Sequence, residues 1–261
     1  QDEQTGEVLD HHAIDAHNAV PPEATVVVPV YDADWIEKND TLNPLLANAG
    51  LTTKERVRMS AGGDVRSLPD RWLGWAMADV LFVGPMPPEH TRAAQVQALL
   101  DWARRGGTLV LTGNALLPRM LRGPWGKAAG VTALEVHRTG ALRAHRAGRD
   151  PKKEDEPLAL QDPVPFVELW PHDAEVLWEA NGLPLLTRRP LGEGVIYTLA
   201  TPAMGLRNEQ LADVCRSLLP SRRPHNPLDP DRFAALATRG GPSAPDVEDD
   251  ADEAPGGVLD Q

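Results

Sequence analysis

The order of apolar and polar positions along this chain predicts a strand–helix–strand core. The β-branched run over 24–30 (ATVVVPV) and the apolar run over 78–83 (ADVLFV) are typical of strands buried on both faces of a parallel sheet. Between 88 and 105, apolar residues recur at helical spacing, and Gly106-Gly107 ends this predicted helix. The strand Thr108–Thr112 follows directly. Such a unit crosses over right-handed, so we expect a parallel sheet. The apolar stripe of the helix comprises Ala94, Val96, Leu99, Leu100, Trp102 and Ala103.

The pattern of the second half is typical of antiparallel strands. An Asn181-Gly182 pair between apolar runs is a strong hairpin signal, and the turn at 192–194 leads into a strand over 195–199. A last helix is expected over 208–219. For residues 24–220 we therefore predict an α/β fold with three layers, flavodoxin-like, in which a mostly parallel sheet is extended by a C-terminal antiparallel hairpin.

The composition of the 261 residues, 41% hydrophobic and 25% charged, excludes a wholly disordered chain. No apolar stretch approaches the roughly 18 residues that cross a bilayer, so we expect no transmembrane segment. The single cysteine, Cys215, excludes an internal disulfide and a cysteine-based zinc site.

Most of the net charge of −12 lies at the two ends of the chain. Residues 1–23 hold six acidic residues and residues 242–261 hold seven, and neither segment has a Lys or Arg, which leaves 24–241 at +1. We expect an acidic arm over 1–23 and a Pro-rich, acidic, low-complexity tail over 221–261. Both are too polar to bury a core, so both should be mobile.

A basic stretch interrupts the fold pattern, and we interpret about 137–156 as an exposed insertion. Its cations could meet phosphate or an acidic partner surface, although a solvated loop is the simpler interpretation. The stretch has no aromatic residue besides histidine on which bases would stack, so nucleic-acid binding is not expected. The cations are Arg138, Arg143, Arg146, Arg149, Lys152 and Lys153.

Three segments carry a family resemblance: LPDRWLGWAMADVLFVG (68–84), QVQALLDWARRGGTLVLTGN (95–114) and PLLTRRPLGEGVIYTLATPAMGL (184–206). Together they resemble class I glutamine-amidotransferase-like domains, and in particular the non-catalytic versions in bacterial envelope proteins and in gliding- or transport-associated auxiliary proteins. The resemblance covers roughly 24–219. It implies a protein partner, within a membrane-associated assembly.

The chain departs from active amidotransferases at the catalytic position. The resemblance implies a nucleophilic cysteine at a sharp strand-to-helix turn, but here the strand Thr108–Thr112 runs into Gly113-Asn114-Ala115. Cys215 instead falls on the apolar face of the last predicted helix, where a buried thiol would be unreactive. Glutaminase chemistry is therefore not expected.

The chain begins at Gln1 rather than at Met. Removal of a secretory signal would explain this, and so would a cloning boundary. Together with the resemblance, it favours a periplasmic or other extracytoplasmic location, and a cytoplasmic location stays open.

Two carboxylates, Asp32 and Asp34, follow the first predicted strand, at the sheet edge where α/β proteins bind ligands. They could hold Mg²⁺. The order of VVVPVYDADW and TLVLT also imitates haloacid-dehalogenase-type hydrolases, with Asp32 as nucleophile, Asp34 as acid and Thr112 as phosphate binder. Trp35 and the lack of a later strand ending in paired aspartates speak against catalysis, and a structural role in the loop is the simpler interpretation.

Other candidate positions are aromatic, amide or histidine side chains. Trp72 and Trp75 flank Gly74. They could contact a ligand or a partner, or they could anchor the loop on the sheet; we favour the anchoring role. Asn114 follows the strand at 108–112. The predicted ligand- or partner-binding residues are therefore Asp32, Asp34, Trp72, Trp75 and Asn114. The one histidine cluster could bind zinc but lacks a core to preorganise it. That cluster is His11, His12, Asp15 and His17.

The sequence thus predicts a non-catalytic binding or scaffolding domain without a cofactor, because the fold is indicated and the nucleophile is missing. The alternative is a Mg²⁺-dependent hydrolase or phosphatase-like enzyme that uses Asp32 and Asp34.

Overall fold

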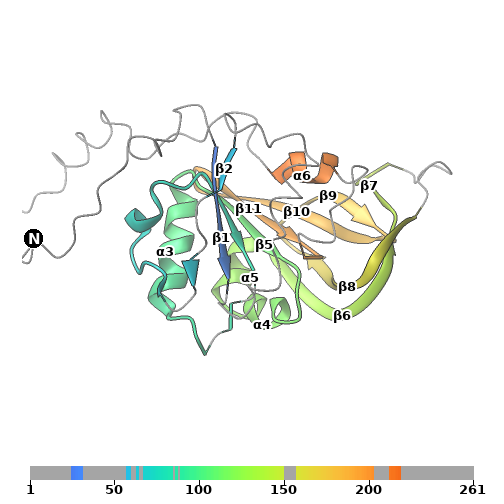
Figure 1. The fold of residues 1–261 in the computed structure, drawn as a ribbon, viewed down its shortest axis with the longest axis horizontal. Helices are drawn as coiled ribbons and strands as arrows, with labels where there is room; N and C mark the ends of the chain where they lie inside the picture. Colours follow the sequence, from blue (N-terminus) through green and yellow to red (C-terminus); the bar gives the residue numbers. More distant parts are fainter. Residues whose placement is uncertain are drawn as a thin grey trace, which may run out of the picture. The chain divides into compact units, whose positions relative to one another are not determined.

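A nine-stranded sheet, parallel on one side and antiparallel on the other, organises the fold (Figure 1). The computed structural model describes residues 25–31, 57–59, 63–64, 67–84, 86–87, 89–149, 157–202 and 212–218. The sheet has the order β2 (Val57–Met59), β1 (Thr25–Tyr31), β4 (Val80–Val83), β5 (Thr108–Thr112), β11 (Gly194–Leu199), β10 (Leu183–Leu191), β9 (Glu175–Ala180) and β7 (Ala144–Arg146), and β3 (Gly63–Asp64) also pairs with β1. Pairing is parallel from β2 to β11 and antiparallel from β11 to β7.

The parallel strands form where the sequence has continuous apolar runs. Every residue of β4 and β5 is buried, which explains why neither strand alternates. Asp79, just before β4, is a buried polar exception: its Oδ2 accepts a hydrogen bond of 2.7 Å from the backbone N–H of Val26. The predicted strands over 24–30, 78–83 and 108–112 are confirmed, and so is the parallel pairing of β4 with β5.

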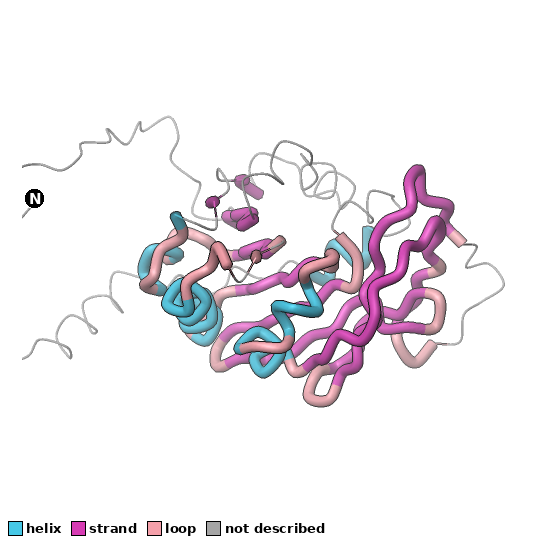
Figure 2. Tube along the Cα trace, turned by 90° about the horizontal axis from the view of Figure 1, so that it is seen from below, coloured by secondary structure: helices cyan, strands magenta, loops and turns pink. Residues whose placement is uncertain are grey.

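Two long strands form a separate antiparallel sheet: β6 (Val131–Leu142) and β8 (Leu158–Pro171). In Figure 2 they lie beside the end of the large sheet. This pair contradicts the sequence interpretation of 137–149 as a solvated loop, since residues 137–142 belong to β6 and residues 144–146 to β7. Charged side chains are compatible with a strand that has one solvent-facing side. Residues 150–156 of that predicted insertion lie outside the described residues.

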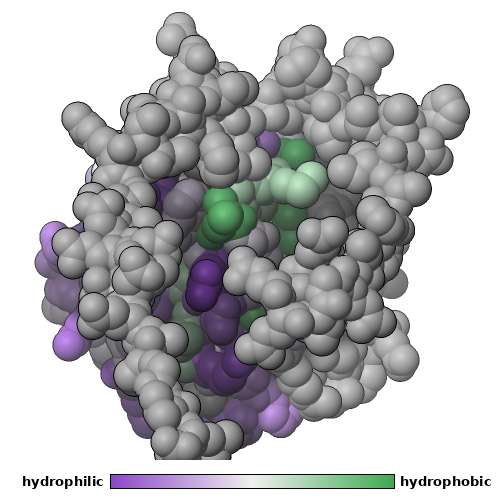
Figure 3. All heavy atoms as spheres, turned by 90° about the vertical axis from the view of Figure 1, so that its left-hand side faces the viewer, coloured by the Kyte–Doolittle hydropathy of each residue, from purple (hydrophilic) through white to green (hydrophobic). Residues whose placement is uncertain are grey.

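Helices cover parts of both the parallel and the antiparallel side of the large sheet. They are the 3₁₀ helix η3 (Trp72–Trp75) and the α-helices α3 (Ala93–Arg104), α4 (Leu117–Leu121), α5 (Pro124–Ala129) and α6 (Ala212–Leu218). The predicted helix over 88–105 is confirmed as the shorter α3, and Gly106 ends it with φ 115°. Figure 3 views the molecule from the side on which α3 lies in Figure 1; among the coloured residues on this face, the hydrophobic ones lie above most of the hydrophilic ones.

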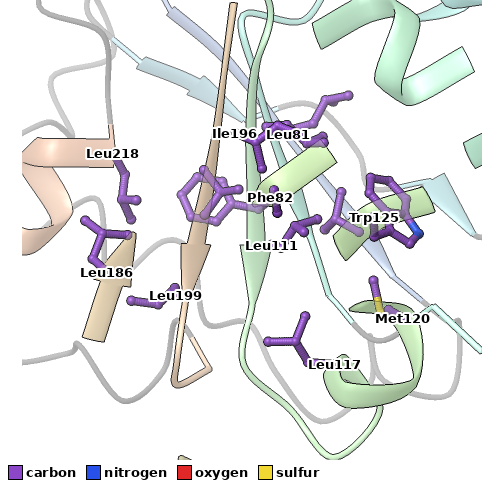
Figure 4. Packing of buried hydrophobic residues seen from close by; sticks show 14 of the residues in the cluster. Leu81, Phe82, Leu111, Leu117, Met120, Trp125, Leu186, Ile196, Leu199 and Leu218 are labelled. Carbon is purple, nitrogen blue, oxygen red and sulfur yellow. The ribbon is translucent and has the colours of Figure 1, made fainter. Parts of the chain in front are cut away.

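Helices contact both faces of the large sheet. Successive side chains of a strand point to opposite faces, and Arg189 of β10 donates to the carbonyl of Ala128 in α5 at 3.0 Å. Leu186, three positions earlier, lies on the other face, where Figure 4 shows Leu218 of α6 close to it. The described structure is therefore a mixed α/β fold, compatible with the predicted three layers, and the C-terminal hairpin is confirmed.

The predicted acidic arm (1–23) and low-complexity tail (221–261) lie outside the described residues. Within the described ranges, no helix is long and apolar enough to cross a membrane.

Candidate functional site

The turn after β5 is closed to any side chain. A Cβ added at Gly113 would lie 2.2 Å from the carbonyl oxygen of Ala200 and 2.5 Å from the nitrogen of Thr201. The backbone N–H of Gly113 also donates to the carbonyl of Thr201 at 3.1 Å. The segment that follows β11 therefore lies against this turn. Backbone atoms therefore fill the space that a side chain at Gly113 would occupy.

Asn114, a predicted ligand-binding residue, organises the same turn. Its side chain is buried, and its Oδ1 accepts hydrogen bonds from the backbone N–H groups of Leu116 at 2.8 Å and Leu117 at 3.1 Å. Its Nδ2 donates to the carbonyl of Thr112 at 2.7 Å. These bonds satisfy N–H groups at the start of α4, which a helix leaves without internal partners. The structure gives Asn114 this structural role, and its ligand role stays a prediction.

Thr112, the predicted phosphate binder, is also engaged within the sheet. It is buried, and its hydroxyl donates to the carbonyl of Val83 at 3.2 Å. Asp32 and Asp34, the predicted magnesium ligands, follow β1 in the sequence and lie outside the described residues. The role of all three in catalysis stays a prediction.

The tryptophans predicted to bind or to anchor pack against the protein itself. Trp75 is buried in the core, and Trp72 is partly buried with the guanidinium carbon of Arg105 4.4 Å from its ring centroid. The anchoring interpretation is confirmed for these contacts, while a role in ligand or partner binding stays a prediction. Trp125, which also follows a Gly-Pro pair, is buried in α5.

An exposed tryptophan, Trp170, was not among the positions predicted from the sequence. Trp170 of β8 is 63% exposed, and Leu134 and Val136 of the neighbouring β6 are 56% and 39% exposed. Alternation along β8 was the available signal, but the charged stretch before it concealed the strand pair. We call Leu134, Val136 and Trp170 the exposed apolar group.

The predicted histidine cluster (His11, His12, Asp15 and His17) lies outside the described residues. Within the described part of the chain, no group of three or more His, Cys, Asp or Glu side chains could hold a metal ion. Cys215 lies in α6, between the buried Val214 and the exposed Arg216.

The environment of Tyr197 in β11 shifts the pKa of its phenol. Burial raises the pKa of the Tyr197 phenol above its usual 10.0, while the charge of Arg188 and a hydrogen bond from it lower that pKa, and the charge of Glu175 raises it. Arg188 also contacts Glu175 at 3.4 Å across the β9–β10 pair. This cluster lies on the face of β10 and β11 that carries Leu186 and Leu199, away from the turn after β5.

Comparison with known proteins identifies the fold and not an activity. No family model matches the sequence, and no curated protein matches it significantly. The structure is similar to the cytoplasmic protein STM1381 from Salmonella typhimurium, with TM-score 0.56 and 14% identity over 74% of this chain and 98% of that one. It is also similar to a ThuA-like protein from Bacteroides uniformis, with TM-score 0.50 and 12% identity over 83% of this chain and 97% of that one. At such identities the similarity establishes the fold alone.

Proposed function

We propose that this chain is a non-catalytic binding or scaffolding domain with an amidotransferase-like, flavodoxin-like fold. The observation that carries the proposal is the closed turn after β5, where a side chain at Gly113 would overlap the backbone of Ala200. The side chains of Thr112 and Asn114 support it, because both are buried and bonded to backbone atoms of the domain. A domain that only binds a partner needs no reactive side chain at the turn after β5.

The exposed apolar group is the proposed contact surface for a protein partner. Trp170, Leu134 and Val136 lie on the two-stranded sheet, apart from the core of the large sheet. Tryptophan is enriched in protein interfaces because it removes a large apolar area from water while its indole N–H keeps a hydrogen-bond donor. The proposal therefore places the partner against β6 and β8.

A first experiment tests the absence of catalysis. The wild-type chain and an Asp32→Asn/Asp34→Asn variant would be assayed for hydrolysis of glutamine and of a phosphomonoester with Mg²⁺, and melted with and without Mg²⁺. We expect no turnover above buffer and no shift in melting temperature. Mg²⁺-dependent turnover, or stabilisation by Mg²⁺ that disappears in the double variant, would instead establish the hydrolase alternative.

A second experiment tests the partner surface. Wild-type chain and a Leu134→Ser/Trp170→Ser variant would be used to capture proteins from the source cells. A Leu73→Ser/Met77→Ser variant is the matched control, since both of these residues are also exposed and apolar. We expect a partner that the control retains and the β6–β8 variant loses. Loss by the control alone would move the partner surface to the segment around Trp72 and Trp75.

The proposal includes the extracytoplasmic, envelope-associated location that the family resemblance implies. The similar Salmonella proteins STM1381 and STM3548 are named as cytoplasmic, so the location needs its own test. Fractionation of the source cells, with antibody detection of the chain, distinguishes the two compartments.

A further inference from the structure

A cavity of about 660 Å³ opens at the free end of the large sheet, beside the edge strand β7. Its size is in the range of small-molecule sites. It is separate from the turn after β5 and from the exposed apolar group, since it shares no residue with either. Its lining includes Arg143, His145, Arg149, Glu179 and Asn181.

The pairing of β7 with β9 directs polar side chains to this cavity. His145 is directly opposite Glu179 in the ladder, so their side chains share one face of the sheet. Arg143 precedes β7 and Asn181 follows β9, and both line the cavity. The backbone N–H of Arg143 donates to Oδ1 of Asn181 at 3.0 Å, and the N–H of Asn181 donates to the carbonyl of Arg143 at 3.2 Å. Backbone and amide contacts thus fix the frame from which the charged groups project.

His145 is buried, 6% exposed, yet it lines the cavity. Its Nδ1 lies 3.1 Å from the carbonyl oxygen of Arg146, and because that oxygen can only accept, Nδ1 carries a proton. Its Nε2 lies 3.9 Å from Oε2 of Glu179, beyond hydrogen-bond distance. The hydrogen bond of Nδ1 thus fixes the orientation of the imidazole ring, and Nε2 makes no hydrogen bond to a described residue.

Among the described residues that line the cavity, Arg143 and Arg149 are cationic and Glu179 is anionic. Arg149 also interacts elsewhere in the protein, so Arg143 is the cation that favours an anionic ligand. Arg143 is exposed, and its guanidinium forms no ion pair with any residue in the described ranges. A guanidinium offers N–H donors in a fork that matches the oxygens of a carboxylate or phosphate.

We propose that this cavity binds a small molecule through an oxyanion group, a phosphate or a carboxylate. Arg143 contacts the anion, and Nε2 of His145 contacts the ligand from the buried wall. The carboxylate of Glu179 repels ligands with more negative charge, and it accepts a hydrogen bond from a hydroxyl or amine of the ligand. This site goes beyond the proposed function and does not depend on it, because it lies outside both the closed turn and the proposed partner surface.

Titration calorimetry of the full chain with inorganic phosphate, and separately with citrate, at constant ionic strength tests the proposal. We expect saturable binding of at least one anion. Binding of phosphate alone, or of citrate alone, identifies the chemistry of the anionic group. If neither anion gives saturable binding, the proposal is overturned.

Three variants test whether the cavity is the site. Arg143→Gln should weaken the binding about tenfold, the effect of losing one charge-assisted hydrogen bond. Glu179→Gln should strengthen it, because it removes a negative charge from the cavity wall. Arg122→Gln is the matched control: it removes one positive charge from an exposed arginine at the end of α4 and should leave affinity unchanged.

The opposite signs make the result decisive even if one variant folds poorly. Equal weakening by Arg143→Gln and Arg122→Gln would mean that only net charge matters, and the site would be rejected. Unchanged affinity in Glu179→Gln and Arg143→Gln would also reject it. Amide chemical-shift changes on adding the anion should centre on residues 143–149 and 179–182.

Discussion

The two halves of this molecule are built on different sequence patterns. In the parallel half, β4 and β5 are buried at every position, and their residues pack between layers (Figure 4). In the antiparallel half, most side chains of β6 are exposed, and half of those in β9 are partly buried. The parallel half has the turn after β5, where backbone leaves no room for a side chain at Gly113. The antiparallel half has the exposed tryptophan and the charged cavity.

This contrast indicates where new function can arise in such a fold. A strand buried on both faces cannot change a side chain without changing the core, whereas a strand with a solvent-facing side can gain charged or aromatic residues at little cost in stability. We therefore expect substitutions in the parallel half to lower stability more than substitutions on the exposed strands of the antiparallel half. Two comparisons between the halves and two measurements on the strands that join them test how far stability differs.

The largest difference should come from leucine truncation. Leu111→Ala removes a side chain that is 0% exposed in β5, and should lower the free energy of unfolding by about 3 kcal/mol. Leu134→Ala, the matched control in β6, is 56% exposed and should change it by less than about 0.5 kcal/mol. Urea unfolding followed by tryptophan fluorescence measures both. Equal losses would mean that β6 is as buried as β5.

Two glycines provide the next comparison. Gly113→Ala places a methyl group against the backbone of Ala200 and should destabilise the protein by about 2–3 kcal/mol. Gly140→Ala in β6 meets nothing within 4 Å, and should be neutral or slightly stabilising, because alanine loses less backbone entropy on folding than glycine. Thermal melts of the two variants would measure the difference. A well-folded Gly113→Ala variant would show that the turn after β5 can open, and would weaken the argument against catalysis.

A smaller effect is expected where the halves join. Thr187 of β10 and Thr198 of β11 are directly opposite each other, both are 1% exposed, and neither hydroxyl has a hydrogen-bond partner in the described structure. Replacing each by valine removes an unsatisfied buried hydroxyl and should stabilise the protein by about 1 kcal/mol. The single and double variants, compared by urea unfolding, give the coupling between the two positions. Destabilisation would indicate that a buried water binds both hydroxyls.

The smallest effect is a dependence on alkaline pH. Because burial raises the pKa of Tyr197 in the folded state, the unfolded chain loses this proton first as the pH rises. The resulting stability is present in full below pH 10.0, the ordinary value, and is lost as the pH rises through the folded-state pKa. Wild-type protein should therefore lose more stability above that pH than Tyr197→Phe does.

The free energy of unfolding, measured between about pH 8 and 11 on either side of the usual phenol pKa, tests this prediction. The chain has two tyrosines, so phenolate absorbance in the variant reports Tyr31 alone and serves as the control. Parallel pH profiles for wild type and variant would contradict the raised pKa.

The sequence by itself determined the buried parallel strands and two of the turns that end the elements. A strand made of continuous apolar residues keeps them from water only when both of its faces are buried. Turns that need a positive φ favour glycine or asparagine, and Gly106, Asn181 and Gly182 all have positive φ. The absence of cysteine at 113–115 needed no structure.

Only the tertiary structure decided the rest, because partners distant in sequence determine it. Gln95 is 0% exposed although it is polar, since its amide donates to the carbonyl of Leu68, and no local pattern indicates that contact. The stretch after 137 resembled a loop because its strand partners lie in β8 and β9, and the pairing of His145 with Glu179 follows from that register. A period of two indicates a strand, but which strand it meets, and so which side chains form a site, is set by the packing of the whole sheet.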